Sequence, residues 1–165
     1  MTDQSLVWQQ PDWIDWTQRM LNSFRDLLER ELITRSDPMN DSRDLFQAPF
    51  VAVAHGVQDD PLLNYGNLTA LSLWQMTLDE LIGTPSRRTA EPVHRDERAR
   101  LLQRTRDDGY IDDYSGIRIS SSGQRFRIHQ AIVWNVFDDR GNRVGQAATF
   151  SDWDFLDDSQ TSHIH

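Results

Sequence analysis

Apolar residues recur with a helical period near the start of the chain. Between residues 13 and 34 they are separated by steps of three and four, the spacing that places side chains on one face of an α-helix. The stripe comprises Trp13, Trp16, Met20, Phe24, Leu27, Leu28 and Leu32. Asp12 precedes it and is expected to cap the helix, because a carboxylate can accept hydrogen bonds from the free N–H groups of a first turn.

The apolar stripe of this helix needs a surface to pack on. Two surfaces fit the pattern equally well: the protein's own sheet, or the same helix of a second copy. In the second case the dimer interface would consist of Trp13, Trp16, Met20, Phe24, Leu27 and Leu28. We expect a homodimer, and the pattern leaves open whether this helix packs within its own chain or across the dimer.

The next part of the chain is typical of a linker followed by a β-hairpin. Residues 36–44 (SDPMNDSRD) are rich in turn-forming residues and predict a linker. Residues 45–54 (LFQAPFVAVA) predict a strand with a proline near its start, where a missing donor is tolerated. Residues 55–61 (HGVQDDP) predict a tight turn, because Gly56 permits unusual backbone angles and the ring of Pro61 fixes its backbone φ angle. The apolar residues then resume at 62–67 (LLNYGN), which predicts the return strand.

Helix signals occupy the middle of the chain. Asn67 can cap the short helix that follows it. Thr77 and Glu80 have the spacing of a capping box, in which side chain and backbone satisfy each other at a helix start. Residues 91–107 form the longest helix of this region, with a thin apolar side, and Gly109 ends it.

From residue 110 the apolar period changes to two. Residues 110–120, 125–137 and 143–153 predict three strands joined by glycine-containing hairpin turns. Strict alternation along the middle strand would place Phe126, Ile128, Ile132, Trp134 and Val136 on one face. It would place Arg125, Arg127, His129 and Asn135 on the other.

These elements predict an α+β protein in three parts. Residues 1–40 would hold the amphipathic helix and linker, residues 41–155 the domain, and residues 156–165 a disordered polar tail. The length of 165 residues suits one domain with an appendage.

Composition narrows the functional class. A net charge of −9 argues against nucleic-acid binding, which needs clustered basic side chains. The first residues lack the pattern of a signal peptide, and no apolar run approaches the ~18 residues of a membrane span. We therefore expect a cytoplasmic protein with neither a nucleic acid nor a membrane as partner. The absence of cysteine excludes thiolate catalysis and thiol-linked chromophores.

Four long segments resemble a known family. The order of two strands, short helices, a longer helix and three antiparallel strands resembles a PAS domain. At family level, LFQAPFVAVAHGVQDDPLLNYGNLTALSLW, PSRRTAEPVHRDERARLL, DDYSGIRISSSGQRFRI and GQAATFSDW resemble the PAS-related MEKHLA domain. This domain occurs in stand-alone bacterial and cyanobacterial proteins and at the C-terminus of plant class III homeodomain–leucine zipper factors. The homeodomain and zipper are not present in this sequence, so the resemblance implies nothing about DNA binding.

The resemblance implies a five-stranded antiparallel sheet with short helices on one face, here preceded by an N-terminal amphipathic helix. Such domains sense small molecules, light or redox state, or they mediate dimerisation. The expected function is a small sensory or regulatory module, not an enzyme. It would bind a small ligand, dimerise, or do both, with output through a separate signalling protein. A rival hypothesis is an interaction module with a filled core and no ligand.

Aromatic and polar residues on the facing elements form the candidate ligand site. They are His55, Asn64, Tyr65, Asn67, Trp74, Tyr114, Arg118, Phe126, Arg127 and Trp134. Arg118 and Arg127, on neighbouring predicted strands, could hold an anionic ligand, because a guanidinium binds carboxylates in a fork. Cross-strand pairing with Asp112 or Asp113 would explain these two arginines equally well.

The sequence names no cofactor and no metal site. A light-sensing flavin adduct needs a cysteine and is excluded, whereas a noncovalent flavin has no supporting motif. Haem is not expected, because His94 lies at the start of its predicted helix, away from a deep pocket. A third hypothesis is a small enzyme that uses His55 and Asp60 as an acid–base pair.

Overall fold

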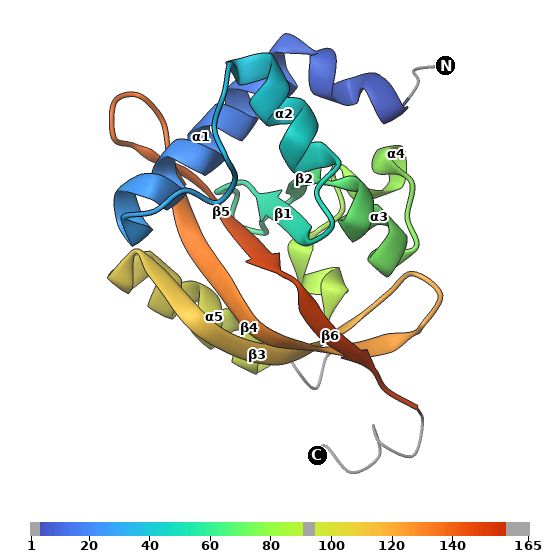
Figure 1. Ribbon diagram of the computed structural model, residues 1–165. Helices are drawn as coiled ribbons and strands as arrows, with labels where there is room; N and C mark the ends of the chain where they lie inside the picture. Colours follow the sequence, from blue (N-terminus) through green and yellow to red (C-terminus); the bar gives the residue numbers. More distant parts are fainter. Residues whose placement is uncertain (1–3, 91–94, 158–165) are drawn as a thin grey trace.

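The computed structural model describes residues 4–90 and 95–157. Its centre is an antiparallel sheet with strand order β2-β1-β5-β4-β3, and β6 also pairs with β4 (Figure 1). The strands are β1 (Val51–His55), β2 (Leu63–Gly66), β3 (Tyr110–Ile119), β4 (Arg125–Phe137), β5 (Arg143–Phe150) and β6 (Asp152–Phe155). The helices are η1 (Gln4–Gln9), α1 (Pro11–Leu28), α2 (Pro38–Phe46), α3 (Leu68–Trp74), α4 (Leu78–Leu81), η2 (Ser86–Thr89) and α5 (Arg95–Asp108). The predicted α+β class and antiparallel sheet are confirmed.

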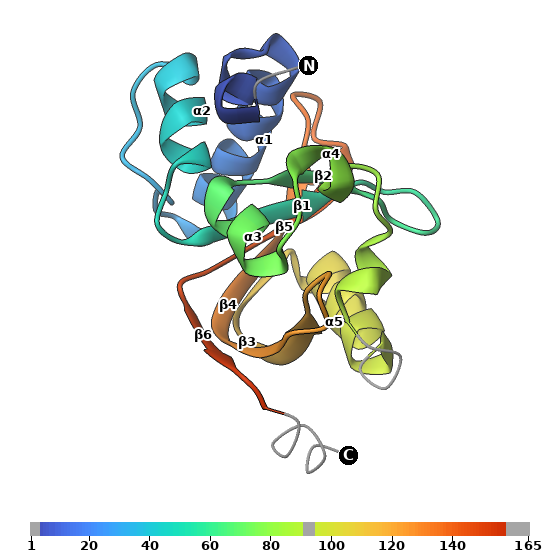
Figure 2. The same ribbon diagram turned by 90° about the vertical axis from the view of Figure 1, so that its right-hand side faces the viewer.

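Helices cover both faces of the sheet. Figure 2 shows α5 on the side of the sheet that is turned away from α1. One apolar core lies between α1 and the sheet, and a second lies between the sheet and the layer of α3 and α5. None of the helices in the described part of the chain is both long and apolar enough to cross a membrane.

Helix α1 packs on the sheet of its own chain. Met20 and Phe24 are fully buried, and the Phe24 ring meets Trp134 of β4 edge-on at 5.0 Å between centroids. Trp134 Nε1 donates a hydrogen bond to the Met20 carbonyl at 3.1 Å, and the backbone N–H of Phe137 donates to Ser23 Oγ at 2.9 Å. Of the two expected surfaces for the stripe, the structure therefore uses the protein's own sheet.

The predicted limits and cap of this helix are wrong. Gln10 occupies the N-cap position without a capping side-chain bond, Pro11 follows it, and Asp12 lies within the first turn. The helix ends at Leu28 and not at residue 34, because Glu29 adopts a left-handed conformation with φ of 58°.

The predicted linker at 36–44 is also wrong, since most of it forms α2. Asp37 caps this helix by accepting a hydrogen bond from the backbone N–H of Asn40, and Pro38 takes the first-turn position that suits proline. Buried Asp41 pairs with Arg35 at 2.8 Å and so fixes α2 against the preceding segment. The expected division after residue 40 therefore falls inside a helix, and β1 begins at Val51 instead of residue 45.

The predicted β1–β2 hairpin and the predicted helix caps are present. Val53 of β1 pairs with Gly66 of β2. Asn67 caps α3, and Thr77 forms the capping box with Glu80 at the start of α4. Gly109 follows α5 with φ of 92°, a conformation that favours glycine. The start of the predicted helix at 91–94, which includes His94, lies outside the described residues.

Strand β4 contains a bulge that the alternation rule did not predict. Gln130 has φ of 50°, and the register with β3 shifts between Tyr114, which pairs with Ala131, and Gly116, which pairs with Ile128. A bulge inserts one residue and reverses which face later side chains occupy. Phe126, Ile128, Ala131 and Val133 therefore belong to one core, whereas Ile132, Trp134 and Val136 face α1. The single apolar face predicted for this strand is wrong.

The packing of α1 yields a prediction about stability. Phe24→Ala should lower the free energy of unfolding by about 3–5 kcal/mol, because it opens a cavity next to Trp134 in a fully buried core. Arg25→Ala, on the exposed side of the same helix, is the matched control and should change it by less than about 0.5 kcal/mol. Urea titration measures both values. A small loss for Phe24→Ala would mean that α1 does not pack on this sheet in solution.

Candidate functional site

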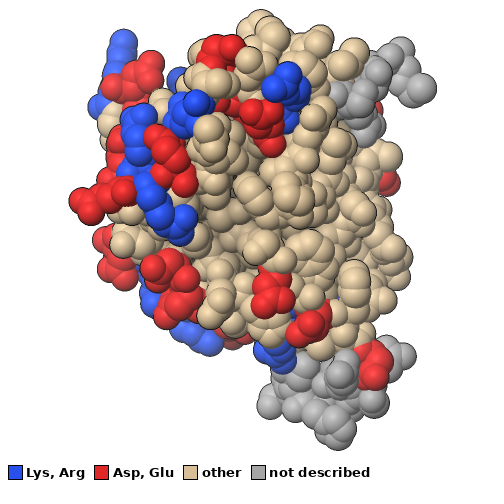
Figure 3. Space-filling view, in the orientation of Figure 1, with Lys and Arg blue, Asp and Glu red and all other residues tan. Residues whose placement is uncertain are grey.

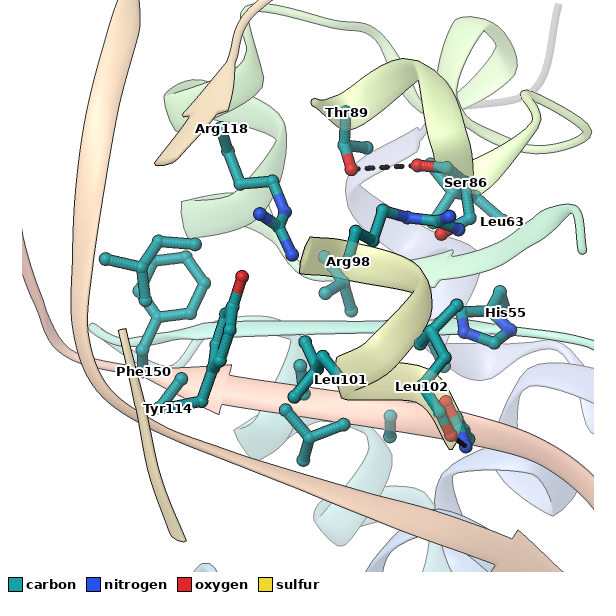
Figure 4. A pocket seen from close by; sticks show the side chains of 18 of the residues that line it. His55, Leu63, Ser86, Thr89, Arg98, Leu101, Leu102, Tyr114, Arg118 and Phe150 are labelled. Atoms are coloured by element: carbon teal, nitrogen blue, oxygen red, sulfur yellow. Dashed lines mark hydrogen bonds between the residues drawn. The ribbon is translucent and has the colours of Figure 1, made fainter. Parts of the chain in front are cut away.

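A cavity lies between the sheet and the helical layer that contains α5, η2 and α3. Figure 4 shows side chains from η2 and α5 at this cavity, facing others from the strands. The cavity has a volume of about 80 Å³, counted as the space that the centre of a water molecule can occupy. One water needs about 10–15 Å³ of such space. The cavity therefore has room for several waters or a small organic group.

The walls of the cavity are largely apolar. Trp74 from α3, Leu101 from α5, Val133 from β4 and Phe150 from β5 all line it. Trp74 is held in place by edge-on ring contacts, including one to Phe150 at 6.2 Å between centroids. Apolar walls with a few polar groups are typical of small-molecule sites.

Arg118 is the most buried charge on the cavity wall. It is 7% exposed, and its Nη1 donates to the carbonyl of its neighbour Ile117 at 2.9 Å. Its guanidinium lies over the ring of Tyr114, 5.4 Å from the centroid. Within residues 4–90 and 95–157, Arg118 makes no ion pair. A buried guanidinium without a carboxylate is costly, so this group has unused capacity to bind an anion.

Tyr114 presents its hydroxyl group to the same region. Figure 4 shows this hydroxyl and the Arg118 guanidinium turned toward each other. The hydroxyl lies over Gly116, where a Cβ atom would come within 2.6 Å of Tyr114 Cζ, so glycine leaves the space that the ring uses. It donates a long hydrogen bond to Glu97 Oε1 at 3.3 Å. Burial raises the pKa of the Tyr114 phenol, which keeps the hydroxyl protonated and able to donate.

His55 contributes a buried hydrogen-bond acceptor. Its Nδ1 lies 2.9 Å from the Gly56 carbonyl oxygen. A carbonyl can only accept, so Nδ1 carries the hydrogen and Nε2 is left with its lone pair. Nε2 is buried and has no hydrogen-bond partner in the described part of the chain. Burial lowers the pKa of His55 to about 4, so the ring is neutral near pH 7.

Gln146 contributes a second buried acceptor next to the first. It pairs with His55 across β1 and β5 and is 1% exposed. Its Nε2 donates to the Leu102 carbonyl at 3.1 Å and to Asn135 Oδ1 at 3.2 Å, and these two acceptors fix the orientation of the amide. Gln146 Oε1 is then buried with no partner among the described residues. His55 Nε2 and Gln146 Oε1 are therefore two neighbouring buried acceptors without donors among the described residues.

Four of the ten predicted ligand residues line this cavity: His55, Trp74, Tyr114 and Arg118. Phe126 packs behind the wall, edge-on to Trp74 at 5.2 Å between ring centroids. Whether the four lining residues bind a ligand stays a prediction.

Two of the predicted aromatic residues lie on the other side of the sheet. Tyr65 and Trp134 are fully buried in the core beneath α1, where Tyr65 stacks on Trp13 with 4.6 Å between ring centroids. The bulge at Gln130 explains the position of Trp134, because it moved the later residues of β4 to that face.

Asn67 has a structural role in this arrangement. Its Nδ2 donates to the carbonyls of Leu45 and Phe50, and its Oδ1 accepts from the backbone N–H groups of Ala52 and Ala70. All the hydrogen-bonding capacity of the amide is used, so none remains for a ligand.

The expected pairing of Arg118 with Arg127 around an anion is not present. Arg127 pairs with Ile117 across the β3–β4 ladder, and alternation along β4 places its side chain on the face opposite to Phe126 and the cavity. Asn64 lies on β2 outside the cavity wall.

Sequence reasoning missed Arg98 and Gln146, which both line the cavity. Arg98 shares a buried helix face with Leu101 and Thr105, at spacings of three and four. Gln146 is the polar residue of the otherwise small and apolar run VGQAA, and a lone polar residue in such a strand is a signal that could have been used.

The acid–base pair of the enzyme hypothesis is not formed. His55 is buried and bonded to Gly56, whereas Asp60 is exposed and pairs with Arg87 at 3.1 Å. In the described ranges, no three His, Asp or Glu side chains are grouped closely enough to hold a metal ion.

The burial of His55 yields a prediction about pH. The His55 ring takes up a second ring proton near pH 4 in the folded protein and near pH 6.5 in the unfolded protein. The unfolded state therefore takes up more protons as the pH falls from about 6.5 to about 4, and stability is lost in that window. At about pH 5 the loss should be about 2 kcal/mol.

Urea unfolding of the wild type and of His55→Gln, at about pH 7.5 and about pH 5, isolates this contribution. Both proteins carry the same carboxyl groups, so the wild type should lose about 2 kcal/mol more than the variant. Equal losses would mean that His55 is not buried as a neutral group.

Comparisons with known proteins agree with this architecture. The sequence profile of the MEKHLA domain matches residues 14–155. No curated protein matches the chain. Among solved structures, the PAS domain of a protein from Colwellia psychrerythraea superimposes with a TM-score of 0.57 at 12% identity, over 67% of this chain and 91% of that one.

Two light-oxygen-voltage structures are also similar. One, from a study of a flavin analogue, has a TM-score of 0.53 at 17% identity and covers 73% of this chain and 87% of its own. The other, an RNA-binding light-oxygen-voltage receptor, has a TM-score of 0.59 at 16% identity and covers 81% of this chain but 38% of its own. Identities this low establish a shared fold only.

The profile match covers most of the chain and includes most of α1 together with the whole sheet. The resemblance found in the sequence is confirmed: the chain belongs to the MEKHLA domain family, which is related to PAS domains.

Proposed function

We propose that this protein is a small sensory or regulatory module that binds a small ligand in the cavity between α5 and the sheet. The observation that carries the proposal is the presence of buried polar groups on the wall of an otherwise apolar cavity. His55 Nε2 and Gln146 Oε1 are buried acceptors without partners in the described residues, and Arg118 is a buried cation without an ion pair there.

The energetics of these groups support a ligand. A buried acceptor left without a donor costs about 1–3 kcal/mol, and a buried cation without a counter-charge costs more. A core selected only for stability would place apolar side chains at these positions. A ligand that pairs with these groups would recover the cost, and its departure would change the stability of the cavity walls.

The fold comparisons support the same class of function. PAS and light-oxygen-voltage domains are sensory folds, and one of the similar structures comes from work on a flavin analogue. This chain contains no cysteine, so any flavin or other chromophore in the cavity would be held without a thiol bond.

Output would pass to a separate protein or to a second copy of the chain. A homodimer remains part of the proposal, but the six residues first considered for its interface are in the cores beneath α1. With Met20 and Phe24 fully buried, a dimer would have to use another surface.

A specific surface feature favours the second candidate, an interaction module without a ligand. Leu68 and Phe155 are exposed and, together with Trp153, line a shallow groove between α3 and β6. Figure 3 shows charged side chains gathered mainly over the α1 and α2 side of this view, with a broad uncharged surface beside them. Exposed apolar side chains such as those of Leu68 and Phe155 often mark protein contacts where they gather on a surface.

Native mass spectrometry of the protein purified from its own host, with an absorbance scan of the same sample, tests the proposal. We expect a defined extra mass on the wild-type protein. Ala148→Phe should remain folded and lose that mass, because Ala148 lines the cavity and a phenyl ring would fill it. Val57→Phe places the same phenyl ring at an exposed position of the loop between β1 and β2 and should keep the mass.

A wild-type protein without added mass, and without absorbance beyond its Trp and Tyr, would favour the interaction module. Retention of the mass by Ala148→Phe would place the ligand outside this cavity. The same spectra report the number of chains in the assembly.

A further inference from the structure

Resting on the proposed function, we infer that the cavity is built for a small organic acid that carries a hydrogen-bond donor at the end away from its carboxylate. The carboxylate would bind Arg118, and the donor would bind His55 Nε2 and Gln146 Oε1. This assigns the chemical class of the ligand from the groups that line the cavity.

The charge of the cavity wall favours an anion. Arg98 and Arg118 both line it, and no Asp or Glu in residues 4–90 and 95–157 does. The carboxylate of Glu97 accepts a hydrogen bond from the hydroxyl of Tyr114, whose ring lies against the Arg118 guanidinium. His55 is neutral and adds no charge. An anion that enters this space therefore meets the Arg118 guanidinium at low dielectric.

The geometry around Arg118 suits a carboxylate. One Nη1 hydrogen is used by the Ile117 carbonyl and a further N–H interacts with the Tyr114 hydroxyl. A guanidinium has five N–H donors, so others are left for a forked interaction. Tyr114 lies beneath the guanidinium and limits its movement. The Tyr114 hydroxyl adds a donor on the same side, because its present bond to Glu97 is long.

The acceptors at the other end set a different requirement. Figure 4 shows His55 on the far side of the first turn of α5 from Arg118 and Tyr114. His55 Nε2 and the neighbouring Gln146 Oε1 can only accept, so they offer no hydrogen bond to a second carboxylate, whereas a hydroxyl, amide or amino N–H would be bound. The walls between the two ends are apolar, with Leu101 and Val133 among them.

Isothermal titration of the full chain with three matched probes tests the class. They are 4-hydroxyphenylacetate, which has acid and donor; 4-hydroxyphenylacetamide, which lacks the charge; and 4-methoxyphenylacetate, which lacks the donor. We expect 4-hydroxyphenylacetate to bind about tenfold or more tightly than either of the other probes. The amide loses the charge-assisted hydrogen bonds to Arg118, and the methoxy compound loses the buried hydrogen bonds to the two acceptors.

Variants of the two arginines provide the control within the protein. Arg118→Met should weaken binding of 4-hydroxyphenylacetate about tenfold or more, and Arg118→Lys should restore part of it by keeping the charge. Arg127→Met removes the same charge from the opposite face of the adjacent strand and should leave binding unchanged. Thermal unfolding of each variant checks that it is folded, and Arg118→Lys keeps the test valid should Arg118→Met fail to fold.

The outcomes separate the ligand class from the ligand-binding function. Equal binding of the amide, or equal effects of Arg118→Met and Arg127→Met, would overturn the organic-acid class and leave the cavity as a binding site. If none of the probes binds, the molecule released from the protein purified from its own host decides. An acid lost in Arg118→Met supports the class, a neutral molecule overturns it, and no molecule at all overturns the proposed function as well.

Discussion

The constraint on which the structure depends is that β4 must bury side chains on both of its faces. It is paired with β3, β5 and β6, and it lies between α1 on one side and α5 on the other. Trp134 faces α1 and its indole N–H is bonded to the Met20 carbonyl, whereas Val133 faces the cavity. Alternation gives every strand two faces, and the bulge at Gln130 decides which residues of β4 meet which core, because it reverses the faces of the residues that follow it.

The two faces of the sheet are packed differently. Beneath α1 the core is filled by interlocking aromatic rings, with Phe24 against Trp134 and Trp13 on Tyr65. On the other face, α5 is held to the sheet by side-chain amides: Asn135 Nδ2 donates to the Thr105 carbonyl, and Gln146 Nε2 to the Leu102 carbonyl. These bonds fix the helix at a distance that leaves a cavity, and they leave the Gln146 oxygen without a donor among the described residues.

Local chemistry made several parts of the fold predictable. The capping box of Thr77 and Glu80, the cap at Asn67 and the glycine stop at Gly109 depend on backbone groups a few residues away, and all three are present. The α2 helix was missed although its signals, Asp37 before Pro38, are also local. There the Ser, Asp, Asn and Pro content was taken as a linker, when the same residues serve as the cap and first turn of a helix.

The sequence by itself determined the family, the antiparallel sheet, the hairpins and most caps, because these depend on neighbouring residues and on the period of apolar positions. Only the tertiary structure decided the site. It placed His55 and Gln146 side by side across two strands that are far apart in the chain, buried Arg118 without a carboxylate among the described residues, and turned Trp134 away from the cavity. The physical reason is that strand register and a bulge decide which face a side chain occupies, and both arise from pairing between distant segments.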